Sequence, residues 1–278
     1  FNPKQQIAII YADGEIIDGN QKTAVAGDRF ASIIAGVRAD STVKAVVLRV
    51  NSPGGSVLAS EKIKSELDLL QKDKPVVASY GEYAASGGYW ISNGSNVIFT
   101  DATTLTGSIG VFGMIPDFSK TAKDVLHIGV ESVNSHKHGD MFGLMRPFDQ
   151  SEFNYMTRSI ENIYDRFVGI VSDNRSLTRE RVDEIAQGRV WTGADALPIE
   201  LVDEIGTLED AVNYAASIAG DPDLGNWSVC GYPSPQTMME KVLEMFYGSS
   251  EESVLLGSLK DFTEAKVLAR MDTQFEVR

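Results

Sequence analysis

One serine of the chain stands in a stretch of unusually small residues. Ser86 lies between Ala84-Ala85 and Gly87-Gly88, shortly after the apolar run Val76–Ala78. A strand that leads through a turn of small residues into a short helix exposes a serine oxygen, and small neighbours let a substrate backbone approach it. We therefore predict that Ser86 is a nucleophile, and we interpret the other residues against that hypothesis.

A serine hydroxyl is a weak nucleophile, so it needs a base. Histidine is the usual base, but the chain contains only His127, His136 and His138. The alternative is a neutral lysine, whose ordinary pKa of about 10.4 must be lowered by burial or by a cationic neighbour. Lys137 lies in an irregular polar segment, residues 136–147, and is the candidate. The alternative interpretation is a solvated surface lysine.

Acyl transfer also needs N–H groups that hold the developing oxyanion. Gly54 and Gly55 follow the apolar run Lys44–Val50 and present backbone N–H groups that no side chain covers. The N–H of Gly87, next to the predicted nucleophile, would be a second donor. A plain turn is the alternative interpretation of the glycine pair. Three further residues are candidates for orienting the lysine or lining the pocket: Ser52, Thr106 and Ser108.

These residues must be positioned by strands that alternate with helices. Short, continuous apolar runs predict strands at 6–11, 44–50, 75–79, 96–100, 108–112 and 129–133. Helical spacing predicts helices at 24–38, 56–71, 87–92, 117–126, 150–174, 178–186, 208–219 and 238–246, and residues 220–231 are interpreted as a loop. This alternation indicates an α/β fold with a mostly parallel sheet. Active sites of such sheets gather at the carboxyl ends of the strands, where the glycine pair and Ser86 both fall.

Composition narrows the classes of partner and site. The 278 residues carry a net charge of −14, which argues against nucleic acid and against an anionic membrane surface. No apolar run reaches the roughly 18 residues of a membrane span. The single cysteine, Cys230, excludes an internal disulfide and a site of several cysteines. We expect no metal or cofactor, because the pair His136 and His138 has no carboxylate cluster nearby in the sequence.

Read together, several blocks in order resemble the signal peptide peptidase A family. The match covers roughly residues 5–220. One departure is Glu200, where the family usually has glycine, and this puts a local turn in doubt. The blocks are Asn51-Ser52-Pro53-Gly54-Gly55-Ser56, residues 84–92, residues 105–111, and residues 188–193 followed by Leu201-Val202-Asp203 and Gly206.

The resemblance implies a serine protease with a Ser-Lys dyad. It implies a fold like that of Clp protease and crotonase, with repeated β-β-α units and a helical extension. The catalytic domain would be residues 1–220, and residues 221–278 would be an extension for packing or oligomer contacts. Ser86 matches the family's nucleophile, and Gly54, Gly55 and Gly87 match its oxyanion hole.

The resemblance also implies substrates, partners and a location. Members cleave residual signal peptides and other small hydrophobic peptides in or near the membrane. They assemble into homo-oligomeric rings whose sites face the interior. The catalytic domain would lie on the extracytoplasmic, periplasmic side of a membrane, or in an equivalent compartment of an organelle.

The source of the lysine differs between short and long members. In short members the lysine follows the β-α core, where Lys137 stands. Long members are tandem duplications, in which the amino-terminal half can supply the lysine and the carboxy-terminal half the serine. The chain opens on Phe1-Asn2-Pro3 without a starting Met, and we expect it to be such a carboxy-terminal half. The base is then either Lys137 or a lysine of the amino-terminal half.

Two other functions fit the same elements. A crotonase-like acyl-CoA enzyme would use the oxyanion hole to stabilise an enolate, with a glutamate or aspartate as acid and base. It has no reason for a serine in the small-residue turn. A non-catalytic half that only assembles a ring is the second alternative.

Overall fold

The computed structural model describes residues 5–233 and 266–270. Within them, residues 5–111, 164–233 and 268–270 form one compact unit, and residues 112–163 with 266–267 form a second. We call these the sheet unit and the second unit. The domain boundary at residue 220 stays a prediction, and the predicted helix at 238–246 lies outside the described residues.

The main sheet belongs to the sheet unit. Its strands follow the order β10-β8-β6-β4-β1-β12, and β7 pairs with both β6 and β11. Every pair is parallel except that of β10 with β8. This confirms the predicted α/β class with a mostly parallel sheet. The bounds are β1 Gln5–Asp13, β4 Val43–Ser52, β6 Val76–Ala85, β7 Val97–Thr100, β8 Leu105–Gly107, β10 Val190–Thr192, β11 Glu204–Ile205 and β12 Trp227–Tyr232.

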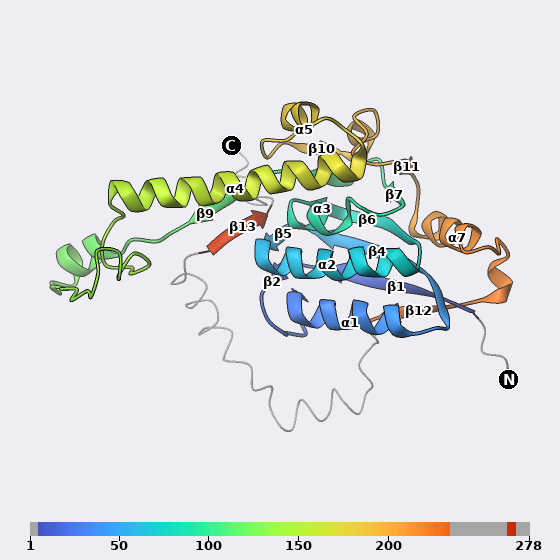
Figure 1. Cartoon of the computed structure of the whole chain (residues 1–278), viewed down its shortest axis with the longest axis horizontal. Helices are drawn as coiled ribbons and strands as arrows, with labels where there is room; N and C mark the ends of the chain where they lie inside the picture. Colours follow the sequence, from blue (N-terminus) through green and yellow to red (C-terminus); the bar gives the residue numbers. More distant parts are fainter. Residues whose placement is uncertain (1–4, 234–265, 271–278) are drawn as a thin grey trace, which may run out of the picture. The chain divides into compact units, whose positions relative to one another are not determined.

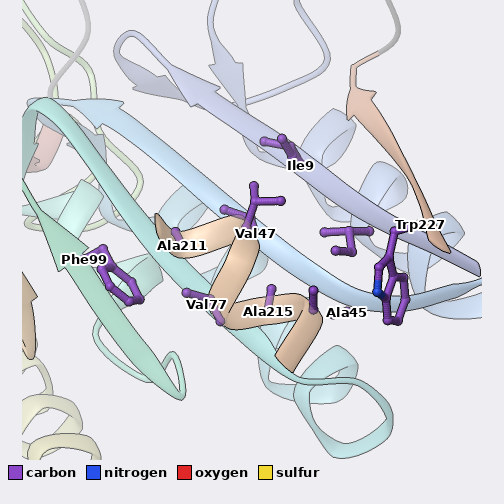
Figure 2. Packing of buried hydrophobic residues seen from close by; sticks show 11 residues of the cluster. Ile9, Ala45, Val47, Val77, Phe99, Ala211, Ala215 and Trp227 are labelled. Carbon is purple, nitrogen blue, oxygen red and sulfur yellow. The ribbon is translucent and has the colours of Figure 1, made fainter. Parts of the chain in front are cut away.

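Helices lie against both faces of this sheet. Helices α1 (Gly27–Ala39) and α2 (Val57–Asp73) pack against each other, and Figure 1 shows them running side by side along the strands. Helix α7 (Leu208–Ile218) packs on the sheet too, and alternate residues of the central strands, among them Ile9 and Val47, are buried with it (Figure 2). Each such buried side chain contributes about 1.5–3 kcal/mol. The core therefore holds β4 and β6, the strands that lead to the predicted site.

A smaller sheet joins the start of α2. Strand β2 (Ile16–Ile17) pairs in parallel with β3 (Val25–Ala26) and with β5 (Gly54–Ser56). On its other side, β5 pairs antiparallel with residues 268–270 of β13 (Lys266–Arg270). The segment β4-β5-α2 is thus one of the β-β-α units that the family resemblance implies.

The remaining elements are shorter, apart from one long helix. The sheet unit also contains α3 Gly87–Ser92, α5 Arg179–Ile185, α6 Gly193–Ala196 and the 3-10 turn Leu224–Asn226. The second unit contains β9 Phe112–Met114, a π-helical turn at Thr121–Val125 and the beginning of α4 Gln150–Arg175, which continues into the sheet unit. None of the helices in the described ranges is long and apolar enough to cross a membrane.

Four predicted elements differ from the structure. Only Phe112 of the predicted strand 108–112 lies in a strand, because Ser108 is left-handed (φ 47°) and the segment is hydrogen-bonded to residues 188 and 189 instead. Residues 129–133 are exposed and form no strand, because they find no strand to pair with among the described residues. The helix predicted at 117–126 is reduced to helical residues 119–120 and the π-helical turn.

The fourth difference concerns the predicted loop at 220–231, which is wrong from Trp227 onward. Residues from Trp227 onward form β12, which pairs in parallel with β1 at the edge of the main sheet. The side chain of Trp227 is buried in the core beside α7. The Gly- and Asp-rich composition of residues 220–231 is typical of a loop. The strand forms because it pairs with β1, which lies more than 200 residues earlier in the sequence.

Candidate active site

Ser86 lies at the junction between β6 and α3, where it is the N-cap residue of the helix. Its backbone is left-handed, with φ 54° and ψ −115°, close to the first central position of a type II′ turn. A residue with a side chain is rarely held there unless its surroundings determine it. Here the Ser86 N–H donates to Gly107 O at 2.8 Å, and its carbonyl accepts from the Trp90 N–H at 2.8 Å. Hydrogen bonds of its N–H and of its carbonyl therefore fix the turn conformation of Ser86.

Among the described residues, the hydroxyl of Ser86 has no hydrogen-bond partner. Its Oγ is buried, the residue is 0 % exposed, and it does not cap α3 although it stands at the N-cap. Serine at an N-cap usually accepts a backbone N–H of its helix, and buried polar atoms are usually paired. The expectation that the turn exposes the serine oxygen was therefore wrong: within the described residues the oxygen is buried, yet it is left without a partner.

The strand register brings three predicted blocks together at the carboxyl ends of β4, β6 and β8. Ser52 on β4 lies opposite Ala84 on β6, and Ala84 lies opposite Thr106 on β8. A Cβ on Gly88 would come within 2.7 Å of the Ser52 carbonyl oxygen, so only glycine lets α3 approach β4 this closely. The blocks around residues 52, 86 and 106 therefore form one site within the sheet unit.

Backbone geometry explains the glycine pair after β4. Gly54 and Gly55 have φ of 98° and 153°, which L side chains rarely adopt. A Cβ on Gly55 would lie 1.9 Å from the Ile16 carbonyl oxygen, so close pairing with β2 also requires glycine here. The Gly54 N–H donates to Ser52 Oγ at 3.2 Å. The oxyanion role of these glycines stays a prediction beside this structural role.

The N–H of Gly87 is the third predicted oxyanion donor. Gly87 is the first residue of α3, and N–H groups in the first turn of a helix have no partner within it. It directly follows Ser86. Its position matches the prediction, while its role is untested.

The three further candidates, Ser52, Thr106 and Ser108, all lie at this site, and each makes a structural contact. Ser52 Oγ accepts the Gly54 N–H. Thr106 Oγ1 donates to Ala84 O at 2.7 Å, which joins β8 to β6. Ser108 is left-handed, and its N–H donates to Arg189 O at 2.8 Å. These contacts hold the strands around Ser86 together, and any orientation of a lysine by these residues stays a prediction.

Helix α3 is anchored by aromatic residues that the motif analysis did not single out. Tyr89 Oη donates to Leu201 O at 2.8 Å, and burial raises the pKa of this phenol. Trp90 Nε1 donates to Glu61 Oε2 at 3.1 Å, and its ring lies 4.6 Å from that of Phe167. The sequence signal for these aromatic residues was their position within residues 84–92, the block that contains Ser86. These contacts fix the helix that begins at the nucleophile.

The one departure from the family pattern has a conformational consequence. Glu200 is left-handed, with φ 63°, where the family usually has glycine. Arg175 Nε donates to the Glu200 carbonyl at 2.9 Å and Arg175 also pairs with Asp203. The turn therefore keeps the glycine conformation although a side chain is present.

Lys137 belongs to the second unit. Its side chain is 72 % exposed, and its Nζ lies 3.8 Å from Asp149 Oδ2 and 3.5 Å from Ser151 Oγ. The described residues therefore do not bury this ammonium group. The source of the base, Lys137 or a lysine of the amino-terminal half, stays a prediction.

A charge network that sequence reasoning missed lies beside Lys137. Arg146 forms ion pairs with Asp140 and with Glu152, and His138 Nδ1 lies 3.0 Å from Glu152 Oε1. Glu152 is only 1 % exposed, and hydrogen bonds from Arg146 hold the pKa of both carboxyls well below the ordinary value. The network joins the lysine segment to the start of α4.

The same network contains a possible set of metal ligands. His138, Asp149 and Glu152 place ligand atoms within 4.8 Å of one another. Arg146 Nη1 and Nη2, however, donate to the two carboxylate oxygens of Glu152 at 2.7 Å. A cation there would have to compete with a guanidinium for the same oxygens. The donor set therefore fits an ion-pair network better than a metal centre.

The chain is similar in sequence to several proteases. A model of peptidase family S49 matches residues 68–220. Protease 4 of Haemophilus influenzae is 45 % identical over 222 residues, which are 78 % of this chain and 35 % of that protein. The chloroplastic serine protease SPPA of Arabidopsis thaliana is 34 % identical over 279 residues, 97 % of this chain and 41 % of that protein. The chain thus spans between about a third and two fifths of the length of these relatives.

Among solved structures, a mutant ClpP1 from Listeria monocytogenes is similar to the chain. Its TM-score is 0.49 at 15 % identity, and the alignment covers 73 % of this chain and 94 % of that one.

Proposed function

Because the chain belongs to peptidase family S49, we propose that it is a serine endopeptidase in which Ser86 attacks the scissile carbonyl. The observation that carries this proposal is the Ser86 hydroxyl, which is buried and has no partner among the described residues, on a residue held in a left-handed conformation. A serine kept out of helix capping in this way suits a nucleophile better than a structural residue. Family membership also favours peptide hydrolysis over the acyl-CoA alternative.

We place the oxyanion at the N–H groups of Gly87 and of the pair Gly54 and Gly55. All three lie on elements next to Ser86 in the sheet unit, at the carboxyl ends of neighbouring strands. Backbone donors of this kind stabilise the negative charge that develops on the carbonyl oxygen. The Gly54 N–H would exchange its long bond to Ser52 Oγ for a bond to the substrate.

We assign the base to Lys137. In its neutral form it would accept the proton of Ser86, pass it to the leaving amine, and then activate the water that clears the acyl-enzyme. A lysine base needs removal from water, and Lys137 is exposed in the described residues. We propose that bound substrate or a second polypeptide covers it. The alternative is a lysine from the part of the longer relatives that this chain does not span.

An extended peptide is the substrate class that the backbone around the glycine pair supports. Residues 268–270 lie antiparallel to β5, next to Gly54 and Gly55. A substrate peptide would pair with the same strand in place of β13, which adds main-chain hydrogen bonds to the contacts made by side chains. The acyl-CoA alternative gains nothing from such a pairing.

The finer features of the assignment follow the family resemblance. We propose hydrophobic peptides, including residual signal peptides, as substrates, and a homo-oligomeric ring as the working assembly. An amino-terminal half of the same precursor is a further proposed partner. We propose that the catalytic domain works beside a membrane, on its extracytoplasmic side or in an equivalent organelle compartment.

Hydrolysis of a hydrophobic peptide by serine and lysine variants of the full chain tests the mechanism. We expect Ser86→Ala to lower kcat by about 1000-fold or more and Lys137→Ala by about 100-fold or more. Matched controls are Ser60→Ala, which removes another fully buried serine hydroxyl, and Lys123→Ala, which removes another exposed lysine of the second unit. Both controls should keep the wild-type rate.

Three other results would each change the proposed mechanism. Full activity of Ser86→Ala would show that the mechanism is wrong. Loss of activity in Ser86→Ala but not in Lys137→Ala would place the base on another polypeptide. Absence of hydrolysis together with no labelling of Ser86 by a fluorophosphonate would indicate a non-catalytic half.

A further inference from the structure

Strand β6 contains a bulge shortly before Ser86. It pairs with β4 up to Val50 opposite Tyr80, and pairing resumes with Ser52 opposite Ala84. A single residue of β4 therefore faces three residues of β6, Gly81–Tyr83. Bulges next to active sites re-aim the chain that follows them.

The bulge is also the point at which β6 changes its other neighbour. Residues 77–79 of β6 pair with β7, and residues 83–85 pair with β8. The second pairing places Ala85 opposite Gly107, whose carbonyl accepts the N–H of Ser86. The length of the bulge thus determines which residue of β6 reaches the start of α3.

The single residue facing the bulge is Asn51, and its side chain satisfies the bulged backbone. Asn51 Oδ1 accepts the N–H groups of Glu82 at 3.0 Å and Tyr83 at 3.2 Å. Asn51 Nδ2 donates to Asp13 Oδ1 at 2.8 Å, at the end of β1. One amide side chain therefore links the ends of three neighbouring strands.

Two further residues fit the bulge to Asn51. A Cβ on Gly81 would lie 2.9 Å from Asn51 Cβ and Oδ1, so a larger residue at position 81 would displace the amide. Thr104 Oγ1 donates to Gly81 O at 2.6 Å from the other side. The bulge is thus held by side chains where it has left the regular ladder.

We propose that Asn51 is a positioning residue for Ser86, acting through the bulge at Gly81–Tyr83. Without its acceptor, the N–H groups of Glu82 and Tyr83 lose their partner, and the two residues between the bulge and Ser86, Ala84 and Ala85, are free to shift. A displacement of about 1 Å at a nucleophile can lower the rate by 100-fold. This inference rests on the proposed role of Ser86.

Exchange of the donor and the acceptor tests this role in the full chain. Asn51→Ala removes the acceptor. Asn51→Asp keeps it but places a carboxylate against Asp13. The double variant Asn51→Asp with Asp13→Asn restores a donor and an acceptor with their positions exchanged. The matched control is Asn96→Ala, because Asn96 Oδ1 accepts the Val76 N–H at 2.9 Å at the opposite end of β6.

The readouts are kcat and KM on a hydrophobic peptide, the rate of fluorophosphonate labelling of Ser86, and amide hydrogen exchange at residues 82 and 83. We expect Asn51→Ala to lower kcat and the labelling rate by about 100-fold, with a smaller change in KM. Its exchange at residues 82 and 83 should be faster. Asn51→Asp should also be slow, the double variant should recover to within about tenfold of wild type, and Asn96→Ala should keep its kcat.

A wild-type kcat and labelling rate in Asn51→Ala would overturn the inference alone. A folded double variant as slow as Asn51→Asp would also overturn it, because a purely local structural role predicts no such rescue by exchange. Wild-type hydrolysis by Ser86→Ala would overturn both this inference and the proposed function, since no nucleophile would then need positioning.

Discussion

Helices α2 and α3 begin in the same way but use their first serine differently. Ser56 is the N-cap of α2 and Ser86 the N-cap of α3; Ser56 ends strand β5, and Ser86 directly follows strand β6. Ser56 Oγ accepts the Ala59 N–H at 3.2 Å and donates to Asp18 at 2.9 Å. Ser86 Oγ makes neither kind of contact with the part of the chain that the structure describes. The same residue type at the same helix position stabilises the fold in one place and is left available in the other.

Backbone conformation is the physical cause of this difference. Ser56 has φ −58° and ψ 126°, near the extended conformation of a capping residue. Ser86 has φ 54° and ψ −115°, so its side chain leaves in another direction. The bond from the Ser86 N–H to Gly107 O and the anchoring of Trp90 offset the strain of that conformation. A serine at a helix start is thus a candidate nucleophile when its backbone prevents it from capping.

Substitutions of the glycines near the two serines should have the largest effects on stability. Gly55→Ala should lower the free energy of unfolding by more than about 4 kcal/mol, because its Cβ would lie 1.9 Å from Ile16 O. Gly88→Ala should cost less, since its Cβ would lie 2.7 Å from Ser52 O. Urea unfolding measures both changes.

Gly129→Ala is the control for these glycine variants. A Cβ at Gly129 would meet nothing within 4 Å, so stability should change by less than about 0.5 kcal/mol. A Gly55→Ala protein as stable as Gly129→Ala would show that sterics do not determine the start of α2.

Removal of each serine hydroxyl tests the comparison itself. Ser56→Ala should lower the free energy of unfolding by about 1–2 kcal/mol, because it removes a cap and the bond to Asp18. Ser86→Ala should not lower it, because the unpaired hydroxyl contributes no hydrogen bond. Equal losses in the two variants, measured by urea unfolding, would contradict a free Ser86 hydroxyl.

The smallest expected effect concerns backbone strain at Glu200, a residue outside the proposed active site. Glu200 is left-handed like Ser86 but carries no proposed role in the reaction. Glu200→Gly should raise the free energy of unfolding by about 1 kcal/mol, because glycine adopts this conformation without a steric cost. Peptide hydrolysis should stay at the wild-type rate. A loss of activity at unchanged stability would give this turn a part in the site.

Much of the site could be predicted from local sequence. The strands before Ser86 and before Gly54 are continuous apolar runs, and the serine block leads directly into α3. Contacts between distant segments were out of reach. The sequence places Asn51 before the glycine pair but does not indicate that its side chain binds the bulge of β6. Nor does it indicate the ion pair between Arg146 and Glu152. Strand β12 was missed because β1, which it pairs with, stands at the other end of the chain.

The α/β class, the small-residue turn around Ser86 and the position of the glycine pair could all be predicted from local sequence, because periodicity and residue size act over a few neighbouring residues. The folded structure was needed to show that Ser52, Ala84 and Thr106 lie abreast, and that the Ser86 hydroxyl has no partner among the described residues. Strand register and hydrogen-bond satisfaction depend on partners brought together by folding, so neither can be read from spacing along the chain.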